Sequence, residues 1–139
     1  MNTRLRILGQ ILSFALLATF ALSACGNPAG PEVKGRAAVE RVEVIILESF
    51  PVQVNAVAHG WLGDGCTRVD TVTQRRDLEK RTFTVEITTL RPRDAVCTLI
   101  ARPLEQTIAL DVYGLPAGTY TVDVNGVTAT FTLSVDNKL

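Results

Sequence analysis

The sequence is poor in the residues that build catalytic centres. It has one histidine, His59, one tryptophan and three cysteines, and aromatic residues make up only 6% of its 139 positions. Nucleophilic catalysis needs a nucleophile, a base and an orienting group, and the chain has neither a GxSxG motif nor a second histidine. Glycine-rich phosphate loops are missing as well. We therefore expect no catalytic residues, no cofactor and no enzymatic activity.

The sequence also lacks an excess of charge of either sign. Its 14 Lys and Arg residues balance 14 Asp and Glu residues, so nucleic acid is not an expected partner. A metal site is not expected either, because His59 has no partner histidine and the cysteines form no CxxC pair. The length and the 47% of apolar residues fit one folded domain.

One long apolar run is present, at the N-terminus. Residues 7–22 are apolar almost throughout, after a short segment with two arginines and no acid. The run is shorter than the roughly 20 residues of a membrane-spanning helix. Its basic flank is typical of a secretory signal peptide, which we predict over residues 1–24. A buried core helix is the alternative.

This segment ends in Leu22-Ser23-Ala24-Cys25, which resembles the lipobox of bacterial lipoproteins. The resemblance implies cleavage before Cys25 and attachment of a diacylglyceryl group, with palmitate-like chains, to the Cys25 thiol. Two acyl chains on one residue give durable anchoring. We therefore expect membrane lipid as a partner and a position on the extracytoplasmic face of a bacterial cell membrane. An ordinary signal peptide with a stray cysteine is the alternative.

A segment rich in glycine and proline follows the lipobox. It predicts that residues 25–37 comprise the lipidated cysteine and a flexible tether. Pro31 lacks the N–H that a sheet ladder needs, which disfavours an ordered strand here. On this interpretation the folded domain covers residues 38–136.

Cys66 and Cys97 remain once Cys25 is assigned to the anchor. An even number of cysteines in an exported chain favours a disulfide between them. Closing a loop of this size stabilises a domain by about 3–4 kcal/mol in the chain-entropy model. Free thiols or a metal are the alternatives.

From residue 38 onward, apolar and polar residues alternate with the period of β-strands. Asn125-Gly126 is typical of a type I′ turn and predicts a β-hairpin. The pattern favours an all-β fold, an antiparallel β-sandwich. About seven strands are predicted, at residues 39–47, 52–58, 67–74, 82–88, 107–112, 119–124 and 127–135.

The stretch Leu115-Pro116-Ala117-Gly118-Thr119-Tyr120 resembles the approach to a late strand in immunoglobulin-like and fibronectin-type domains. The resemblance implies a tyrosine corner, in which the Tyr120 hydroxyl bonds to upstream backbone. No cysteine stands two residues after Tyr120, so the domain is not of the antibody type. The body of the chain is also similar to a small module of exported bacterial proteins, which implies a fold but no function.

The best candidate for binding is a loop predicted over residues 59–66, which contains His59, Trp61 and Asp64 together with three glycines. Loops at the ends of a sandwich often carry binding residues, and tryptophan is frequent at interaction hot spots. The alternatives are that Trp61 packs in the core and that Asp64 contributes to a calcium site.

The sequence thus predicts a lipid-anchored binding or adaptor module of the bacterial envelope, with an unknown protein or glycan partner. Two other functions stay open. A solvent-exposed Trp61 loop would favour a small protease inhibitor that uses a loop at the end of the sandwich. A large apolar patch on one sheet face would favour a passive structural subunit.

Overall fold

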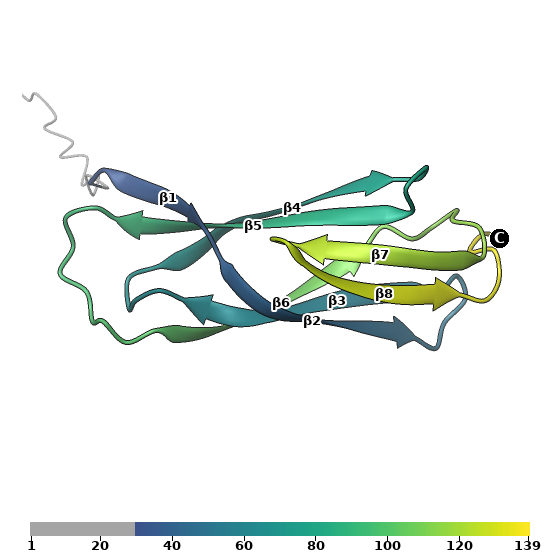
Figure 1. Ribbon diagram of the computed structural model, residues 1–139, viewed down its shortest axis with the longest axis horizontal. Helices are drawn as coiled ribbons and strands as arrows, with labels where there is room; N and C mark the ends of the chain where they lie inside the picture. Colours follow the sequence, from purple (N-terminus) through teal and green to yellow (C-terminus); the bar gives the residue numbers. More distant parts are fainter. Residues whose placement is uncertain (1–29) are drawn as a thin grey trace, which may run out of the picture.

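The computed structural model describes residues 30–139, which form eight strands in two sheets (Figure 1). The predicted signal peptide and Cys25 lie outside the described residues. Among residues 30–139 no helix is long and apolar enough to cross a membrane. The strands are β1 (Glu32–Arg36), β2 (Ala38–Leu47), β3 (Gln53–Leu62), β4 (Arg68–Asp77), β5 (Thr82–Pro92), β6 (Arg102–Leu110), β7 (Gly118–Val124) and β8 (Val127–Leu133).

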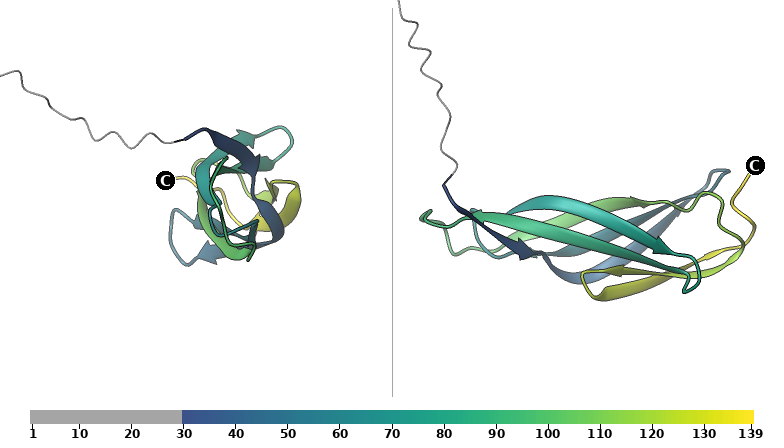
Figure 2. Two further views of the ribbon diagram at one scale, coloured as in Figure 1. Left: turned by 90° about the vertical axis from the view of Figure 1, so that its left-hand side faces the viewer. Right: turned by 90° about the horizontal axis from the view of Figure 1, so that it is seen from above.

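The two sheets pack face to face along the long axis of the molecule. In the smaller sheet β3 lies between β2 and β6, and in the larger sheet β5 pairs with β1, β4 and β7. The end-on view in Figure 2 shows the strands wrapped around a common interior. The prediction of an all-β sandwich is confirmed. One pairing, between β5 and β7, is parallel rather than antiparallel.

Alternating side chains build the core, as the sequence predicted. Phe83, Val85 and Ile87 point inward from β5 and are buried. The rings of Phe83, Tyr120 and Phe131 pack with centroids 5.5 to 6.3 Å apart. The Tyr120 hydroxyl donates a hydrogen bond to the Pro116 carbonyl at 2.8 Å, so the expected structural role of this tyrosine is confirmed.

The predicted hairpin joins β7 to β8. Asn125 and Gly126 both have positive φ, 52° and 96°, as a type I′ turn requires. The Asn125 side chain also bridges to other strands, which its turn position did not predict. Its carbonyl oxygen accepts from the Ile87 N–H, and its amide group donates to the carbonyls of Ala37 and Ile87, all at 2.9 Å. These hydrogen bonds lie between the part of β5 that pairs with β1 and the part that pairs with β7.

The prediction of a flexible tether up to residue 37 is wrong from Glu32 onward. Residues 32–36 form β1, which pairs with the C-terminal half of β5. Pro31 precedes this strand, and its carbonyl accepts a hydrogen bond from the Arg93 N–H at 2.9 Å, so its missing N–H interrupts no ladder. Ala37 is buried in the core. Every residue of β1 is exposed, so the strand has no apolar alternation that would reveal it.

The other predicted boundary, at residue 136, excludes a side chain that belongs to the core. Asn137 is completely buried and bonds to backbone on two distant segments. The folded body therefore begins at Glu32 and extends to at least Asn137.

Candidate functional sites at the two ends of the sandwich

The sandwich has two ends that differ in chemistry. β3 runs from one to the other, a length of about 30 Å for its ten residues. We call the end where β1 starts and β3 finishes the proximal end; it also contains the turn 63–67 and the loop 93–101 (left in Figure 1). The opposite end, with the β2–β3 turn and the C-terminus, is the distal end.

His59 and Trp61 lie on strand β3, not on a loop as predicted. Gly60 between them suggested a break in the strand, but it is an inward-facing strand residue. A side chain at this position would meet the Ala38 carbonyl oxygen, only 1.9 Å from an ideal Cβ, because β2 crosses close to it. The glycine therefore permits a close strand crossing and does not mark a turn.

His59 points outward from β3 between two carboxylates. Its Nε2 lies 3.6 Å from Glu43 on β2, and its Nδ1 lies 3.8 Å from Glu105 on β6. Nε2 is buried and makes no hydrogen bond. In the described part of the chain no three His, Cys, Asp or Glu side chains are grouped as a metal ion would need.

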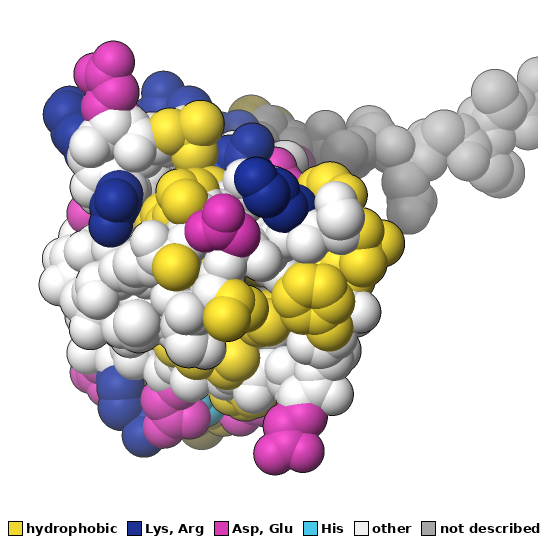
Figure 3. Space-filling view, turned by 90° about the vertical axis from the view of Figure 1, so that its right-hand side faces the viewer, with side chains coloured by type: hydrophobic (Ala, Val, Ile, Leu, Met, Phe, Trp, Pro, Cys, Tyr) yellow, Lys and Arg dark blue, Asp and Glu magenta, His cyan; other side chains and the backbone are white. Residues whose placement is uncertain are grey.

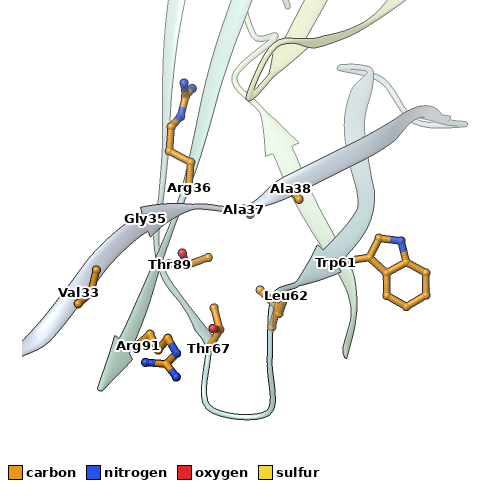
Figure 4. A pocket seen from close by; sticks show the side chains of 11 residues that line it. Val33, Gly35, Arg36, Ala37, Ala38, Trp61, Leu62, Thr67, Thr89 and Arg91 are labelled. Carbon is orange, nitrogen blue, oxygen red and sulfur yellow. The ribbon is translucent and has the colours of Figure 1, made fainter. Parts of the chain in front are cut away.

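Trp61 is an exposed side chain, contrary to the alternative of a core position. Its residue is 45% exposed, and the indole N–H donates a 3.0 Å hydrogen bond to the Glu40 carboxylate. A cavity of about 300 Å³ lies beside it, between β1 and the end of β3. Figure 4 shows Thr67, Thr89 and Arg91 along this cavity, while the Trp61 ring points away from them.

Asp64 is a structural residue of the proximal turn. One carboxylate oxygen accepts from the backbone N–H groups of Cys66 and Thr67, at 3.0 and 2.8 Å, and from the Thr67 hydroxyl at 2.7 Å. The other oxygen accepts from the Arg91 guanidinium. The hydrogen bond with Arg91, followed by those with Thr67, holds the pKa of Asp64 well below its usual 3.8. Its oxygens are thus occupied by protein donors, which leaves the calcium alternative without support from this geometry.

The predicted disulfide between Cys66 and Cys97 is confirmed. It joins the turn 63–67 to the loop 93–101, with the two Cα atoms 5.6 Å apart. The Gly65 N–H donates to the Thr98 carbonyl at 3.0 Å beside it. The proximal end is therefore fastened by a covalent bond and by the ionic contact of Asp64 with Arg91.

The distal end carries an apolar surface that the sequence reasoning missed. Phe50 and Tyr113 are 59% and 58% exposed and stand next to a cavity of about 380 Å³ that Pro51 and Tyr113 line. Figure 3 looks at this end and shows hydrophobic side chains gathered between charged ones. We define the distal apolar surface as Ile46, Leu47, Phe50, Tyr113 and Val135.

A buried amide holds the distal segments together beneath this surface. The Asn137 side-chain oxygen accepts from the Val52 N–H at 2.6 Å, and its amide nitrogen donates to the carbonyls of Val52 and Val112 at 2.9 and 3.0 Å. Its backbone bonds to Gly114 and Leu115. The positions of Phe50 and Tyr113 therefore depend on a residue near the C-terminus. An asparagine in a polar tail gave no sequence signal for this role.

Comparison with known proteins assigns the family. Residues 56–133 match the model of the ORF11 β-sandwich domain. The chain belongs to the ORF11 β-sandwich domain family. This match begins within β3, covers β4 to β8 in full and agrees with the two-sheet architecture.

The relatives of this ORF11 β-sandwich chain include proteins of Herpetosiphon aurantiacus. It is 36% identical over 89 residues to an uncharacterized 10.2 kDa protein in the HgiCIIM 5′ region, covering 64% of this chain and 92% of that protein. Over 79 residues it is 42% identical to uncharacterized 10.2 kDa proteins in the HgiBIM and HgiEIM 5′ regions, covering 57% of this chain and 93% of each. No solved structure matches the chain.

Proposed function

We propose that this protein is a lipid-anchored binding module of the bacterial envelope, and that its distal apolar surface holds a protein partner. Cys25 carries the lipid, at the extracytoplasmic face of the membrane. The observation that carries the binding function is the exposure of two aromatic residues at the distal end, Tyr113, which lines a cavity, and Phe50, which precedes its lining residue Pro51.

The chemistry of this surface suits a protein partner. Aromatic side chains supply much buried area for few rotatable bonds, and tyrosine is enriched where interfaces concentrate their binding energy. The distal surface is apolar at its centre, and charged pairs such as Arg76 with Asp111 (3.2 Å) stand near it, as in the polar rim of an interface.

The position of the surface also fits an anchored module. The chain enters the fold at the proximal end, where β1 begins. A lipid on Cys25 therefore holds the proximal end near the membrane and allows the distal end to reach up to about 30 Å farther out. A surface at that end is accessible to other envelope proteins.

The anchor is tested by fractionating cells that make the full-length chain. The wild-type protein is expected in the membrane fraction, with a mass increased by acyl groups. The Cys25→Ser variant is expected to carry no acyl groups and to keep residues 1–24, because the lipobox that directs both steps is lost. Recovery of the unmodified wild-type protein in the soluble fraction would exclude the lipid anchor.

The binding surface is tested by chemical cross-linking in cells, followed by capture and mass spectrometry. The double variant Phe50→Ala, Tyr113→Ala is compared with wild type and with Val72→Ala, which truncates an exposed apolar residue of β4. One protein enriched with wild type and Val72→Ala but lost from the double variant is the expected result. An unchanged set of captured proteins would exclude the distal surface and direct attention to glycans.

A further inference from the structure

The loop 93–101 between β5 and β6 exposes an unusual group of apolar side chains. Val96 is fully exposed, Leu99 is 93% exposed and Ile100 is 72% exposed. Single exposed aliphatic residues are common on proteins, but three within five residues of one loop are unusual, and we call these three side chains the apolar tip. The loop between β5 and β6 is the outermost part of the proximal end in Figure 1.

The loop is held firmly although its apolar side chains are uncovered. The disulfide fixes Cys97, and the Thr98 carbonyl accepts the Gly65 N–H at 3.0 Å. The fit around Gly65 is close, because an added Cβ would lie 2.2 Å from the Thr98 hydroxyl. A restrained loop loses little conformational entropy when a surface covers it. Because the disulfide and the hydrogen bond already restrain the loop, a surface that binds the apolar tip causes only a small further loss of conformational entropy.

The apolar tip lies beside the point where the chain enters the fold. The Arg93 N–H donates to the Pro31 carbonyl at 2.9 Å, and Glu32 is the register partner of Pro92. Glu32 follows Cys25 by seven residues, a length of chain that spans at most about 25 Å. A lipid on Cys25 thus confines the proximal end to the vicinity of the bilayer.

We propose that the loop 93–101 inserts its apolar tip into the lipid bilayer to which Cys25 anchors the protein. The proposal rests on the lipid anchor of the proposed function. Val96, Leu99 and Ile100 enter the boundary between headgroups and acyl chains, where burial of apolar surface is favourable. Arg93 and Arg102 flank the loop and, with Asp94 beside Arg93, leave it one net positive charge for the anionic headgroups, although the Arg102 guanidinium also donates to the Thr67 carbonyl.

The loop and the lipid then form two attachments at one end of the domain. A lipid alone fixes distance but leaves the domain free to rotate. A second contact fixes the orientation, with the long axis of the sandwich pointing away from the membrane and the distal apolar surface outward. A braced apolar loop also suits insertion into a protease, but such a loop would have to face away from the anchor.

The test places a fluorescent side chain on the loop of the full-length, lipidated protein. In a Trp61→Phe background, Leu99→Trp reports on the loop and Phe50→Trp reports on the distal end. Both proteins are reconstituted into vesicles of phosphatidylethanolamine and phosphatidylglycerol, with and without brominated acyl chains, which quench tryptophan on contact. Flotation of the vesicles shows whether the protein is anchored.

We expect the brominated lipid to remove most of the emission of the Leu99→Trp variant and to leave that of the Phe50→Trp variant unchanged. If both variants float with the vesicles but brominated lipid quenches neither of them, the loop insertion is overturned and the anchor stands. Such a loop would be free to bind a protein such as a protease. A chain that does not float overturns the anchor and the loop insertion together.

Discussion

The two ends of the sandwich are fastened by different means. At the proximal end a disulfide holds the turn 63–67 against the loop 93–101, and the carboxylate of Asp64 holds the same turn to Arg91 on β5. At the distal end one buried amide, Asn137, holds the segments around Val52 and Val112. The bonds at each end hold the backbone in place and leave the nearby apolar side chains exposed. The comparison shows how a small domain can keep exposed apolar residues at both ends in fixed positions.

The largest expected effect concerns the covalent fastening of the proximal end. Replacing Cys66 and Cys97 together by alanine should lower the free energy of unfolding by about 3–4 kcal/mol, from the loop entropy of 31 residues. Urea unfolding of the variant and of wild type measures this difference. A change below about 1 kcal/mol would mean that Asp64 and the hydrogen bond of Thr98 hold this end without the disulfide.

The next largest effect is expected when the hydrogen bonds of Asn137 at the distal end are removed. Asn137→Ala leaves the N–H of Val52 and the carbonyls of Val52 and Val112 without their partner, which should cost about 2–3 kcal/mol. The adjacent variant Lys138→Ala is the control and should unfold as wild type does. Equal midpoints for both variants in urea unfolding would show that the distal end does not depend on this amide.

A smaller effect tests the ionic contact at the proximal end by its pH dependence. The folded pKa of Asp64 lies below its usual 3.8, so ionised Asp64 stabilises the fold above about pH 4 and this contribution is lost as the pH falls further. The stability difference between wild type and Asp64→Asn should therefore shrink from neutral pH to about pH 2. Adding Arg91→Met to Asp64→Asn should change little, because the partner is already lost. A difference that stays constant across this range would contradict the role of the charge.

The smallest effect is expected from the apolar tip of the proximal end. Replacing Val96, Leu99 or Ile100 by serine should change the free energy of unfolding by no more than about 0.5 kcal/mol, because these residues are largely exposed. Ile108→Ala, at a buried position on β6, should cost about 2–5 kcal/mol and is the reference. If replacing Leu99 lowered the free energy of unfolding as much as Ile108→Ala does, the loop would have to fold back on the domain.

Much of the fold could be predicted because its information is local. Alternation along residues 82–88 places Phe83, Val85 and Ile87 inside, and Asn125-Gly126 defines a hairpin within two residues. The disulfide followed from the number of cysteines and the expected compartment. Strand β1 was not predicted because an exposed strand has no alternation of apolar and polar residues. Its hydrogen bonds depend on β5, which lies more than 50 positions later in the sequence.

The candidate site was harder to predict, because its features depend on contacts between distant segments. Gly60 suggested a loop, but the reason for this glycine is the approach of Ala38 from β2. At the distal apolar surface Asn137 ties Val52, near Phe50, to Val112, next to Tyr113, and these three segments are far apart in sequence. No local pattern indicates that a polar residue at the end of the chain is buried.

The most direct test of this two-ended account is photo-cross-linking in living cells. A photoreactive amino acid is placed at Tyr113 or at Leu99 of the full-length chain, and the adducts are analysed after illumination. The account predicts that position 113 yields a cross-link to one envelope protein, whereas position 99 yields lipid adducts and no protein. A protein adduct at position 99 with none at position 113 would contradict the assignment of the two ends.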